Sequence, residues 1–303
     1  MSTVLLDLNH LGLPGAIGSY LVAGSEPTLV DPGPATTLDV LVERLRREGV
    51  GEGDLGHIAL THVHLDHAGA TGHLARLFPR ARIHVHAEGA PHLVDPTRLV
   101  ASTRRTFGEA HDRLWGDVQP VPADRITAWS PGDGALWADF RPVPTPGHIA
   151  HHLAYLDERD GTLFAGDAMG IVLSAEAPSH PPTPPPAVDL EAWRETLEEV
   201  RAIGPERFAA THFGLHEDVP ARVEALGEAL DGLKKRVADA LARGDEEDAG
   251  RYGEEVARRM APFLGSDRAE RYFGTFSAAM DWEGVRFYLQ RRARSREDTE
   301  SDR

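Results

Sequence analysis

Four potential metal ligands crowd into six consecutive residues of this chain: His62, His64, Asp66 and His67. An apolar segment at residues 57–60 comes directly before them and helical spacing follows at 68–78, so they lie on a predicted strand-to-helix loop. In such a loop, side chains at i and i+2 can share one metal while the others reach a second. Because four strong ligands in one loop are hard to explain as packing, the sequence predicts a metal site with two half-sites.

The composition narrows the ligand chemistry and the expected setting. None of the 303 residues is cysteine, so thiolate ligands and disulfides are excluded and the strong ligands must be His, Asp or Glu. A net charge of −16 would repel nucleic acid, and no apolar run approaches the length of about 18 residues that spans a bilayer. Asp7 and His10 interrupt the apolar stretch at 1–13, which is typical of a strand rather than a secretion signal. We expect a cytoplasmic protein that acts on a small molecule and binds neither nucleic acid nor membrane.

Strand-like and helix-like segments alternate along the first 214 residues. The predicted strands lie at residues 4–8, 19–22, 28–30, 57–60, 83–85, 126–129, 136–143, 152–156, 162–165 and 207–210. The predicted helices lie at 37–47, 68–78 and 190–203. Two similar halves of this kind predict an α/β fold in which two sheets pack face to face with helices outside, a four-layer αββα sandwich.

The rest of the chain has the composition of helices. We predict a catalytic domain at 1–214, a helical extension at 215–292 with helices at 219–243, 246–263 and 267–292, and a disordered tail at 293–303. Such an extension packs on the core or on a second copy of the chain, so a homodimer through it is one expected outcome. A proline-rich loop at 178–186 is expected to be exposed and stiff, and it is a candidate wall of the active site.

Three further candidate ligands each lie at or just after the end of a predicted strand. They are His148 in the run Thr145-Pro146-Gly147-His148, Asp167 after Ala165-Gly166, and His212 after Ala210-Thr211. Strand ends on one rim of a sheet converge, so we expect these side chains to meet the His-rich loop. Strand alternation allows only one of the pair His151 and His152 to face that site.

Together these motifs resemble the metallo-β-lactamase fold superfamily, whose pattern is His-x-His-x-Asp-His followed by His, Asp and His. The resemblance spans about residues 4–212 and implies two divalent metal ions. It implies that His62, His64 and His148 hold the first metal, that Asp66, His67 and His212 hold the second, and that Asp167 bridges them. It also implies that Asp31 supports the metal loop without being a ligand. The metal set is similar to that of glyoxalase II, and other segments are similar to a little-characterised prokaryotic branch; the tail has no recognisable glutathione-binding pattern.

This ligand set predicts hydrolysis. Two divalent cations hold a bridging water and lower its pKa toward neutrality, which gives a hydroxide that attacks a small ester, thioester, lactone or phosphoester. Asp66 is the predicted catalytic residue, since it can accept a hydrogen bond from the hydroxide and deliver a proton to the leaving group. His-rich coordination favours zinc, and iron or manganese would also be accepted.

Other functions of the same fold remain open. A persulfide dioxygenase uses one iron held by two His and one Asp, and a binding protein would hold metal without cleaving anything. A true β-lactamase is disfavoured by Asp167, and a nuclease by the acidic charge. A flavodiiron reductase is disfavoured because His64 stands where that family has a Glu. Metal content separates the main alternatives, because hydrolysis needs two metals and no oxygen uptake.

Overall fold

A computed structural model describes residues 2–51, 53–133 and 137–301. Within these ranges the chain forms two compact units, each of them discontinuous in sequence. We call them the sheet unit, which takes its residues from 1–145, 151–167 and 205–217, and the helical unit, which takes them from 146–150, 168–204 and 218–303. Residues 302–303 of the predicted tail, and residue 136 at the start of one predicted strand, lie outside the described part.

Six strands form the first sheet of the sheet unit in chain order: β1 (Thr3–Asp7), β2 (Gly18–Val22), β3 (Thr28–Val30), β4 (His57–Ala59), β5 (Arg82–His86) and β6 (Ile126–Trp129). The first three pair antiparallel and the last three continue from β3 in parallel. Parallel pairing requires crossover connections, which here carry helices. Because β4 ends at Ala59, the His-rich run begins at the carboxyl end of a buried parallel strand.

The second sheet has the order β11-β10-β9-β8-β7. Its strands are β7 (Phe140–Pro144), β8 (Leu153–Asp157), β9 (Thr162–Gly166), β10 (Arg207–Ala210) and β11 (Gly214–His216). Only β9 and β10 pair in parallel, and the other neighbours are antiparallel. Parallel strands end at the same edge, so Asp167 after β9 and His212 after β10 emerge together, as the sequence predicts.

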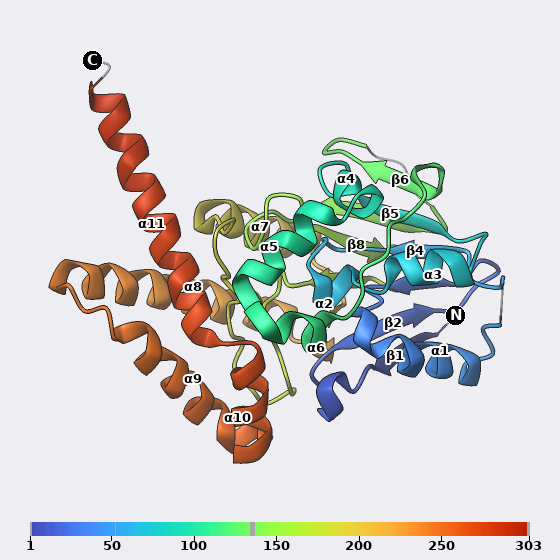
Figure 1. Ribbon diagram of the computed structural model, residues 1–303, viewed down its shortest axis with the longest axis horizontal. Helices are drawn as coiled ribbons and strands as arrows, with labels where there is room; N and C mark the ends of the chain where they lie inside the picture. Colours follow the sequence, from blue (N-terminus) through green and yellow to red (C-terminus); the bar gives the residue numbers. More distant parts are fainter. Residues whose placement is uncertain (1, 52, 134–136, 302–303) are drawn as a thin grey trace. The chain divides into compact units, whose positions relative to one another are not determined.

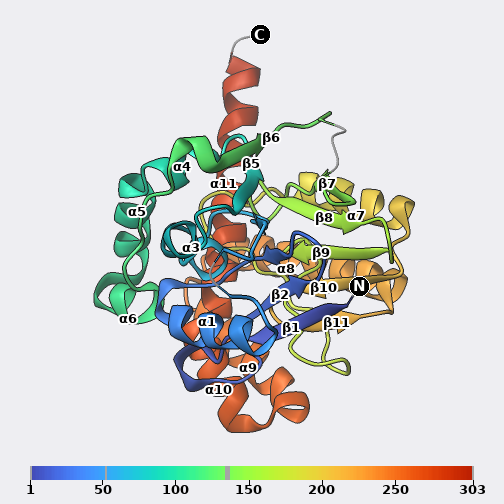
Figure 2. The same ribbon diagram turned by 90° about the vertical axis from the view of Figure 1, so that its right-hand side faces the viewer.

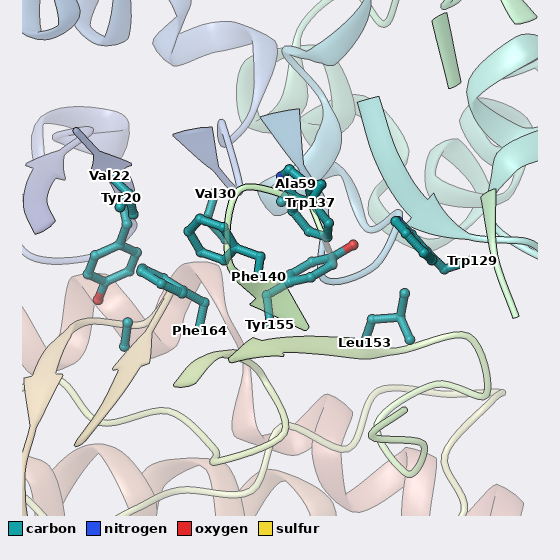
Figure 3. Close-up of a cluster of buried hydrophobic side chains, with 11 residues drawn as sticks. Tyr20, Val22, Val30, Ala59, Trp129, Trp137, Phe140, Leu153, Tyr155 and Phe164 are labelled. Carbon is teal, nitrogen blue, oxygen red and sulfur yellow. The ribbon is translucent and has the colours of Figure 1, made fainter. Parts of the chain in front are cut away.

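Apolar side chains from both sheets share one core (Figure 3). Tyr20 and Val30 come from the first sheet and Phe140, Tyr155 and Phe164 from the second, and none is more than 1% exposed. The buried hydroxyl groups are satisfied by backbone, since Tyr20 donates to the carbonyl of Ala210 at 2.6 Å and Tyr155 to that of Leu60 at 2.8 Å. The apolar sides of the two sheets therefore face each other, as in the sandwich that the sequence predicts.

A polar network lies at one side of this core, around the buried His84. Trp129 donates from Nε1 to Nδ1 of His84 at 3.2 Å, so Nε2 of His84 carries the proton and donates to Nδ1 of His57 at 2.9 Å. The His84 ring also stacks on Trp137 with ring centres 3.9 Å apart. Burial, reinforced by His57 and Arg82, lowers the pKa of His84 to about 3, so this imidazole is neutral near pH 7.

The described part of the sheet unit contains six α-helices. They are α1 (Leu38–Arg47), α2 (Leu65–Ala68), α3 (Thr71–Leu77), α4 (Ala90–Val94), α5 (Thr97–Phe107) and α6 (His111–Trp115). In Figure 2, α1 and α3 lie on the side of the first sheet that faces away from the second. Helix α1 corresponds to the helix predicted at 37–47, and Leu41 and Leu45, one turn apart, are fully inaccessible.

The helical unit contains α7 (Leu190–Ile203), α8 (Val219–Arg243), α9 (Asp248–Leu264), α10 (Ser266–Thr275) and α11 (Ala278–Ser301) (Figure 1). Asp189 caps α7 by accepting from the backbone N–H groups of Glu191 and Ala192. Among the described residues, no helix combines the length and the apolar character that crossing a bilayer requires. The α/β class with two sheets, helices and a helical C-terminal region is confirmed.

Two details differ from the sequence expectations. Helix α11 continues to Ser301, past the predicted end of the extension at Arg292, because the charged residues that follow include no glycine or proline to stop it. The loop at 178–186 was expected to be exposed, which is wrong for its central part: Ser179, His180 and Thr183 are at most 4% exposed. The physical reason is that the imidazole of His180 and both donors of Thr183 are hydrogen-bonded to Asp281 of α11, as described below.

Candidate metal centre

The His-rich run changes direction between its second and third ligands. His64 is extended, with φ −60° and ψ 147°, and Leu65 then begins the short helix α2. His62 and His64 therefore project from a loop, while Asp66 and His67 project from the first turn of a helix. Gly69, at the end of α2, has no room for a side chain, since a Cβ there would lie 2.5 Å from the carbonyl oxygen of Leu65. Local backbone geometry alone thus separates the four ligands into two pairs.

Asp31, directly after β3, holds the ligand-bearing segments together. Its Oδ1 accepts from the backbone N–H of Thr61 at 2.8 Å. Its Oδ2 accepts at 2.8 Å from the hydroxyl groups of Thr61 and Thr211 and from Nδ1 of His67. Asp31 is 0% exposed, so four hydrogen bonds compensate the burial of its charge. With Nδ1 of His67 donating, Nε2 carries the lone pair that a metal needs.

Four ligand atoms of the predicted second half-site surround a small space. Nε2 of His67 lies 3.4 Å from Oδ1 of Asp167 and 3.8 Å from Oδ2 of Asp66. Nε2 of His212 lies 3.4 Å from Oδ2 of Asp66 and 3.8 Å from Oδ1 of Asp167. The other nitrogen of His212, Nδ1, donates to the carbonyl of Ala16 at 3.0 Å, which turns Nε2 toward this space. The structure therefore brings all four predicted side chains together.

These residues fit a metal ion better than they fit one another. The buried Nε2 of His67 makes no hydrogen bond. Ligands at about 2.0–2.1 Å in a tetrahedral zinc shell lie roughly 3.3 Å from one another, close to the shorter of the four distances above. Burial works against charge on His67, but the carboxylates of Asp167, Asp31 and Asp66 outweigh it and raise the pKa of His67 well above its usual value. These three carboxylates make the site electrically negative and suited to a cation.

The predicted first half-site begins with His62 and His64, whose facing atoms Nε2 and Nδ1 lie 2.9 Å apart. The ligand atoms of His62, His67 and Asp167 all lie within 4.8 Å of one another. Asp167 therefore lies within reach of both half-sites, which is the position that a bridging carboxylate requires. The third predicted ligand, His148, belongs to the helical unit, where its Nδ1 donates to the carbonyl of Pro182 at 2.8 Å. Its participation stays a prediction.

One residue near these candidate ligands makes contacts that the sequence does not predict. His152, the second of the adjacent pair, stacks on His62 with ring centres 5.0 Å apart, and its Nε2 accepts from the backbone N–H of Asp167 at 3.2 Å. Its Nδ1 pairs with the hydroxyl of Thr145 at 2.7 Å. Strand alternation predicts that one of the two faces the site, but not that it bonds the backbone of Asp167, the predicted bridging residue. Gly166 leaves room for it, since a Cβ there would lie 2.7 Å from Nε2 of His152.

Comparison with known proteins gives one family. The family model described as the Metallo-beta-lactamase superfamily matches residues 13–212. The uncharacterized protein YobT of Bacillus subtilis is 30% identical over 165 residues, which are 53% of this chain and 66% of that protein. A hydroxyacylglutathione hydrolase of Cupriavidus taiwanensis is 33% identical over 164 residues, which are 52% of this chain and 51% of that protein. The matched region spans less than two thirds of the length of both of these relatives.

Solved structures share the fold. A metallo-beta-lactamase family protein from Thermus thermophilus, TTHA1429, has a TM-score of 0.67 at 22% identity, and the match covers 96% of this chain and 94% of that one. An archaeal metallo-beta-lactamase superfamily protein from Sulfolobus tokodaii, ST1585, has a TM-score of 0.61 at 22% identity, and the match covers 77% of this chain and 86% of that one.

Proposed function

Because the chain belongs to the metallo-beta-lactamase superfamily, we propose that it is a dinuclear metal-dependent hydrolase of a small ester, thioester or lactone. The observation that carries the proposal is the position of Asp167. Its Oδ1 lies 3.4 Å from Nε2 of His67 and 3.8 Å from Nε2 of His212, and it also groups with His62. Asp167 thus lies near one predicted ligand of the first metal, His62, and two of the second, His67 and His212, as a carboxylate that bridges two metals must.

The proposed ligands are those of the resemblance: His62, His64 and His148 for the first metal, Asp66, His67 and His212 for the second, and Asp167 between them. When bound, two such cations supply a hydroxide nucleophile at neutral pH and polarise the substrate oxygen. Zinc is the proposed metal, and the same nitrogen and oxygen ligands would accept iron or manganese.

The chain's own contribution to the chemistry centres on Asp66. Burial alone would raise the pKa of its carboxyl group, but His67 and His212 outweigh burial and hold that pKa well below its usual value. Asp66 is therefore ionised near pH 7 and can accept a hydrogen bond from the nucleophile. It retains partial access to solvent, with a side chain 16% exposed, so a proton received there can reach the leaving group or water.

Two observations support the proposed substrate class, the name of a relative and the net charge. The name of the relative hydroxyacylglutathione hydrolase describes hydrolysis of a thioester, which supports an ester or thioester as the substrate of this chain. A net charge of −16 favours neutral or weakly charged substrates over polyanions. Phosphoesters are retained in the test panel because the same ligands suit them.

The test combines metal analysis with a panel of aryl esters, acyl thioesters, lactones and phosphodiesters. We expect two metal ions per chain, cleavage of at least one ester, thioester or lactone, and no oxygen uptake. One iron per chain with thiol-dependent oxygen consumption would identify a persulfide dioxygenase instead. Bound metal with no cleavage of any compound would favour a binding protein.

Substitution of the bridging residue is the sharpest form of this test. We expect Asp167→Ala to abolish hydrolysis and to lower the metal content below that of the unaltered protein, because both half-sites lose a ligand. The exposed Asp124→Ala serves as the matched control and should change neither. Full activity and two metal ions in Asp167→Ala would overturn the dinuclear proposal.

A further inference from the structure

The peptide group between Pro182 and Thr183 is hydrogen-bonded on both sides to residues far away in the sequence. Its carbonyl oxygen accepts from Nδ1 of His148 at 2.8 Å. Its N–H donates to Oδ1 of Asp281, on helix α11, at 2.7 Å. All these residues belong to the helical unit. One planar amide therefore connects the carboxylate of Asp281 to the imidazole of His148.

We propose that Asp281 is a positioning residue for His148 and acts on it through the Pro182–Thr183 peptide. This rests on the proposed function, in which His148 is a metal ligand. Because Nδ1 donates to Pro182, the ring is held in the tautomer whose lone pair is on Nε2, the atom available to a metal. A carboxylate on the N–H side of the amide makes the carbonyl oxygen a stronger acceptor, since hydrogen bonds in a chain polarise one another.

The loop needs this support because of its composition. Six of the nine residues at 178–186 are proline, which has no N–H to donate, so only three backbone N–H groups of the loop can form hydrogen bonds. One of these, on His180, is used in a β-bridge to Ile171. Thr183 gives both of its donors to Asp281, since its hydroxyl donates to the backbone carbonyl of that residue at 2.9 Å. The second oxygen of the Asp281 carboxylate, Oδ2, accepts from Nε2 of His180 at 2.7 Å.

Burial makes these contacts effective. His148 is 2% exposed, Thr183 0% and Asp281 7%, so water does not compete for the hydrogen bonds that join them. Gly284, one helical turn after Asp281, lets the loop approach this closely, because a Cβ there would overlap the carbonyl oxygen of Thr183. The loop is therefore seated directly on the backbone of α11.

A different face of α11 connects it to the other helices. Trp282 donates from Nε1 to Oδ2 of Asp248, on α9, at 2.9 Å, and Arg236, on α8, donates to the same carboxylate from Nε at 2.8 Å. Asp248 is 5% exposed. It is thus a buried aspartate that contacts α11, as Asp281 contacts the loop, but it has no hydrogen bond to the loop among those described. A comparison of Asp281 with Asp248 therefore distinguishes an effect on His148 from an effect on the packing of the helices.

The experiment compares Asp281→Asn with Asp248→Asn in the metal-loaded protein. Asn keeps an acceptor for Thr183 but removes the negative charge. We expect Asp281→Asn to weaken binding of one of the two zinc ions by about 10-fold or more in a chelator competition. We also expect it to shift the exchangeable Nδ1 proton of His148 in NMR spectra, a signal assigned by its loss in His148→Ala. Asp248→Asn should lower the unfolding temperature without either effect.

A second variant protects the test against simple misfolding. Gly284→Ala should displace the Thr183 carbonyl and reproduce the zinc and Nδ1 effects, with the far-UV circular dichroism unchanged. Native zinc affinity and an unshifted Nδ1 proton in both Asp281→Asn and Gly284→Ala would overturn the proposal, as would equal zinc effects in Asp248→Asn. If the unaltered protein binds fewer than two metal ions, the proposed function fails separately, and the Nδ1 proton of His148 still decides whether Asp281 positions the ring.

Discussion

The sheet unit and the helical unit support a predicted metal-binding histidine in two different ways. In the sheet unit, Nδ1 of His67 donates directly to the carboxylate of Asp31 at 2.8 Å, and the two residues are 36 positions apart. In the helical unit, Nδ1 of His148 donates to a carbonyl at 2.8 Å, and the carboxylate stands one amide further away, on a helix 98 positions after that amide. The geometry at the imidazole is the same, but the source of the negative charge is not.

This difference determines how widely a substitution in each unit disturbs the candidate metal ligands. Asp31 also bonds Thr61 and Thr211, so any change there disturbs several ligand-bearing segments at once. Asp281 reaches a single amide and the neighbouring His180, so its effect is confined to one loop. We therefore expect substitutions in the sheet unit to have large, general effects and those in the helical unit to have small, local ones.

The largest expected effect comes from Asp31→Ala. Removal of this buried carboxylate leaves His67 and two threonine hydroxyls without their acceptor, and we expect a loss of about 3–5 kcal/mol in the free energy of unfolding together with loss of metal. Urea unfolding and metal analysis measure both. Glu43→Gln, at an exposed ion pair with Arg47, is the control and should change the stability by less than about 0.5 kcal/mol. If Asp31→Ala were as stable as the unaltered protein, the sheet unit would not depend on this carboxylate, and its contrast with the helical unit would fail.

An intermediate effect is expected for His84→Phe under acid conditions. The unfolded chain takes up a proton at His84 near its ordinary pKa of 6.5, whereas burial lowers the folded pKa to about 3. The neutral ring therefore stabilises the folded state fully above pH 6.5, and this contribution is lost as the pH falls toward 3. Between pH 6.5 and pH 5 the loss from this residue is about 2 kcal/mol, and His84→Phe should lack it.

Urea unfolding of both proteins at the two pH values measures this difference. At pH 6.5 the variant should be less stable, because the indole of Trp129 and Nδ1 of His57 lose their partner. The gap between the two proteins should narrow at pH 5. Parallel pH dependences for the two proteins would contradict the assignment of the acid sensitivity to His84.

The smallest effect is expected for Arg291→Ala in the helical unit. Arg291 donates from Nη2 to the carbonyl of Val188 at 3.0 Å and from Nη1 to that of Pro186 at 3.4 Å, at the end of the loop away from the Pro182–Thr183 amide. We expect a loss of less than about 1 kcal/mol in stability and no change in zinc affinity, as measured by thermal unfolding and chelator competition. A change in zinc affinity as large as that of Asp281→Asn would mean that the whole loop, rather than one amide, positions His148.

The sequence predicts much of the fold and of the candidate site because the relevant signals are local. The four candidate ligands of the His-rich run lie within six consecutive residues. Asp167 and His212 each follow a strand, and those strands, β9 and β10, pair in parallel and end at the same edge. Helix α1 lies within the range 37–47 predicted from local spacing, for the same reason.

The contacts that escaped prediction join segments distant in the chain. Nothing near His152 indicates that it bonds the backbone of Asp167, because that contact exists only once β8 and β9 have paired. The burial of Thr183 was likewise hidden, since the partner that satisfies it is a carboxylate on α11. Proline content indicated a stiff loop, but whether water or protein surrounds it depends on packing alone.

The helical unit is assembled from three stretches of chain, with His148 in the first, the proline-rich loop in the second and Asp281 in the third. This arrangement limits how the protein can be modified by recombination. A chimera that takes only residues 218–303 from a relative would combine the relative's α11 with this chain's proline-rich loop. The hydrogen bond between Thr183 and Asp281 would then depend on residues from two different proteins. Transfer of the extension between relatives should succeed only when residues 178–186 are transferred with it.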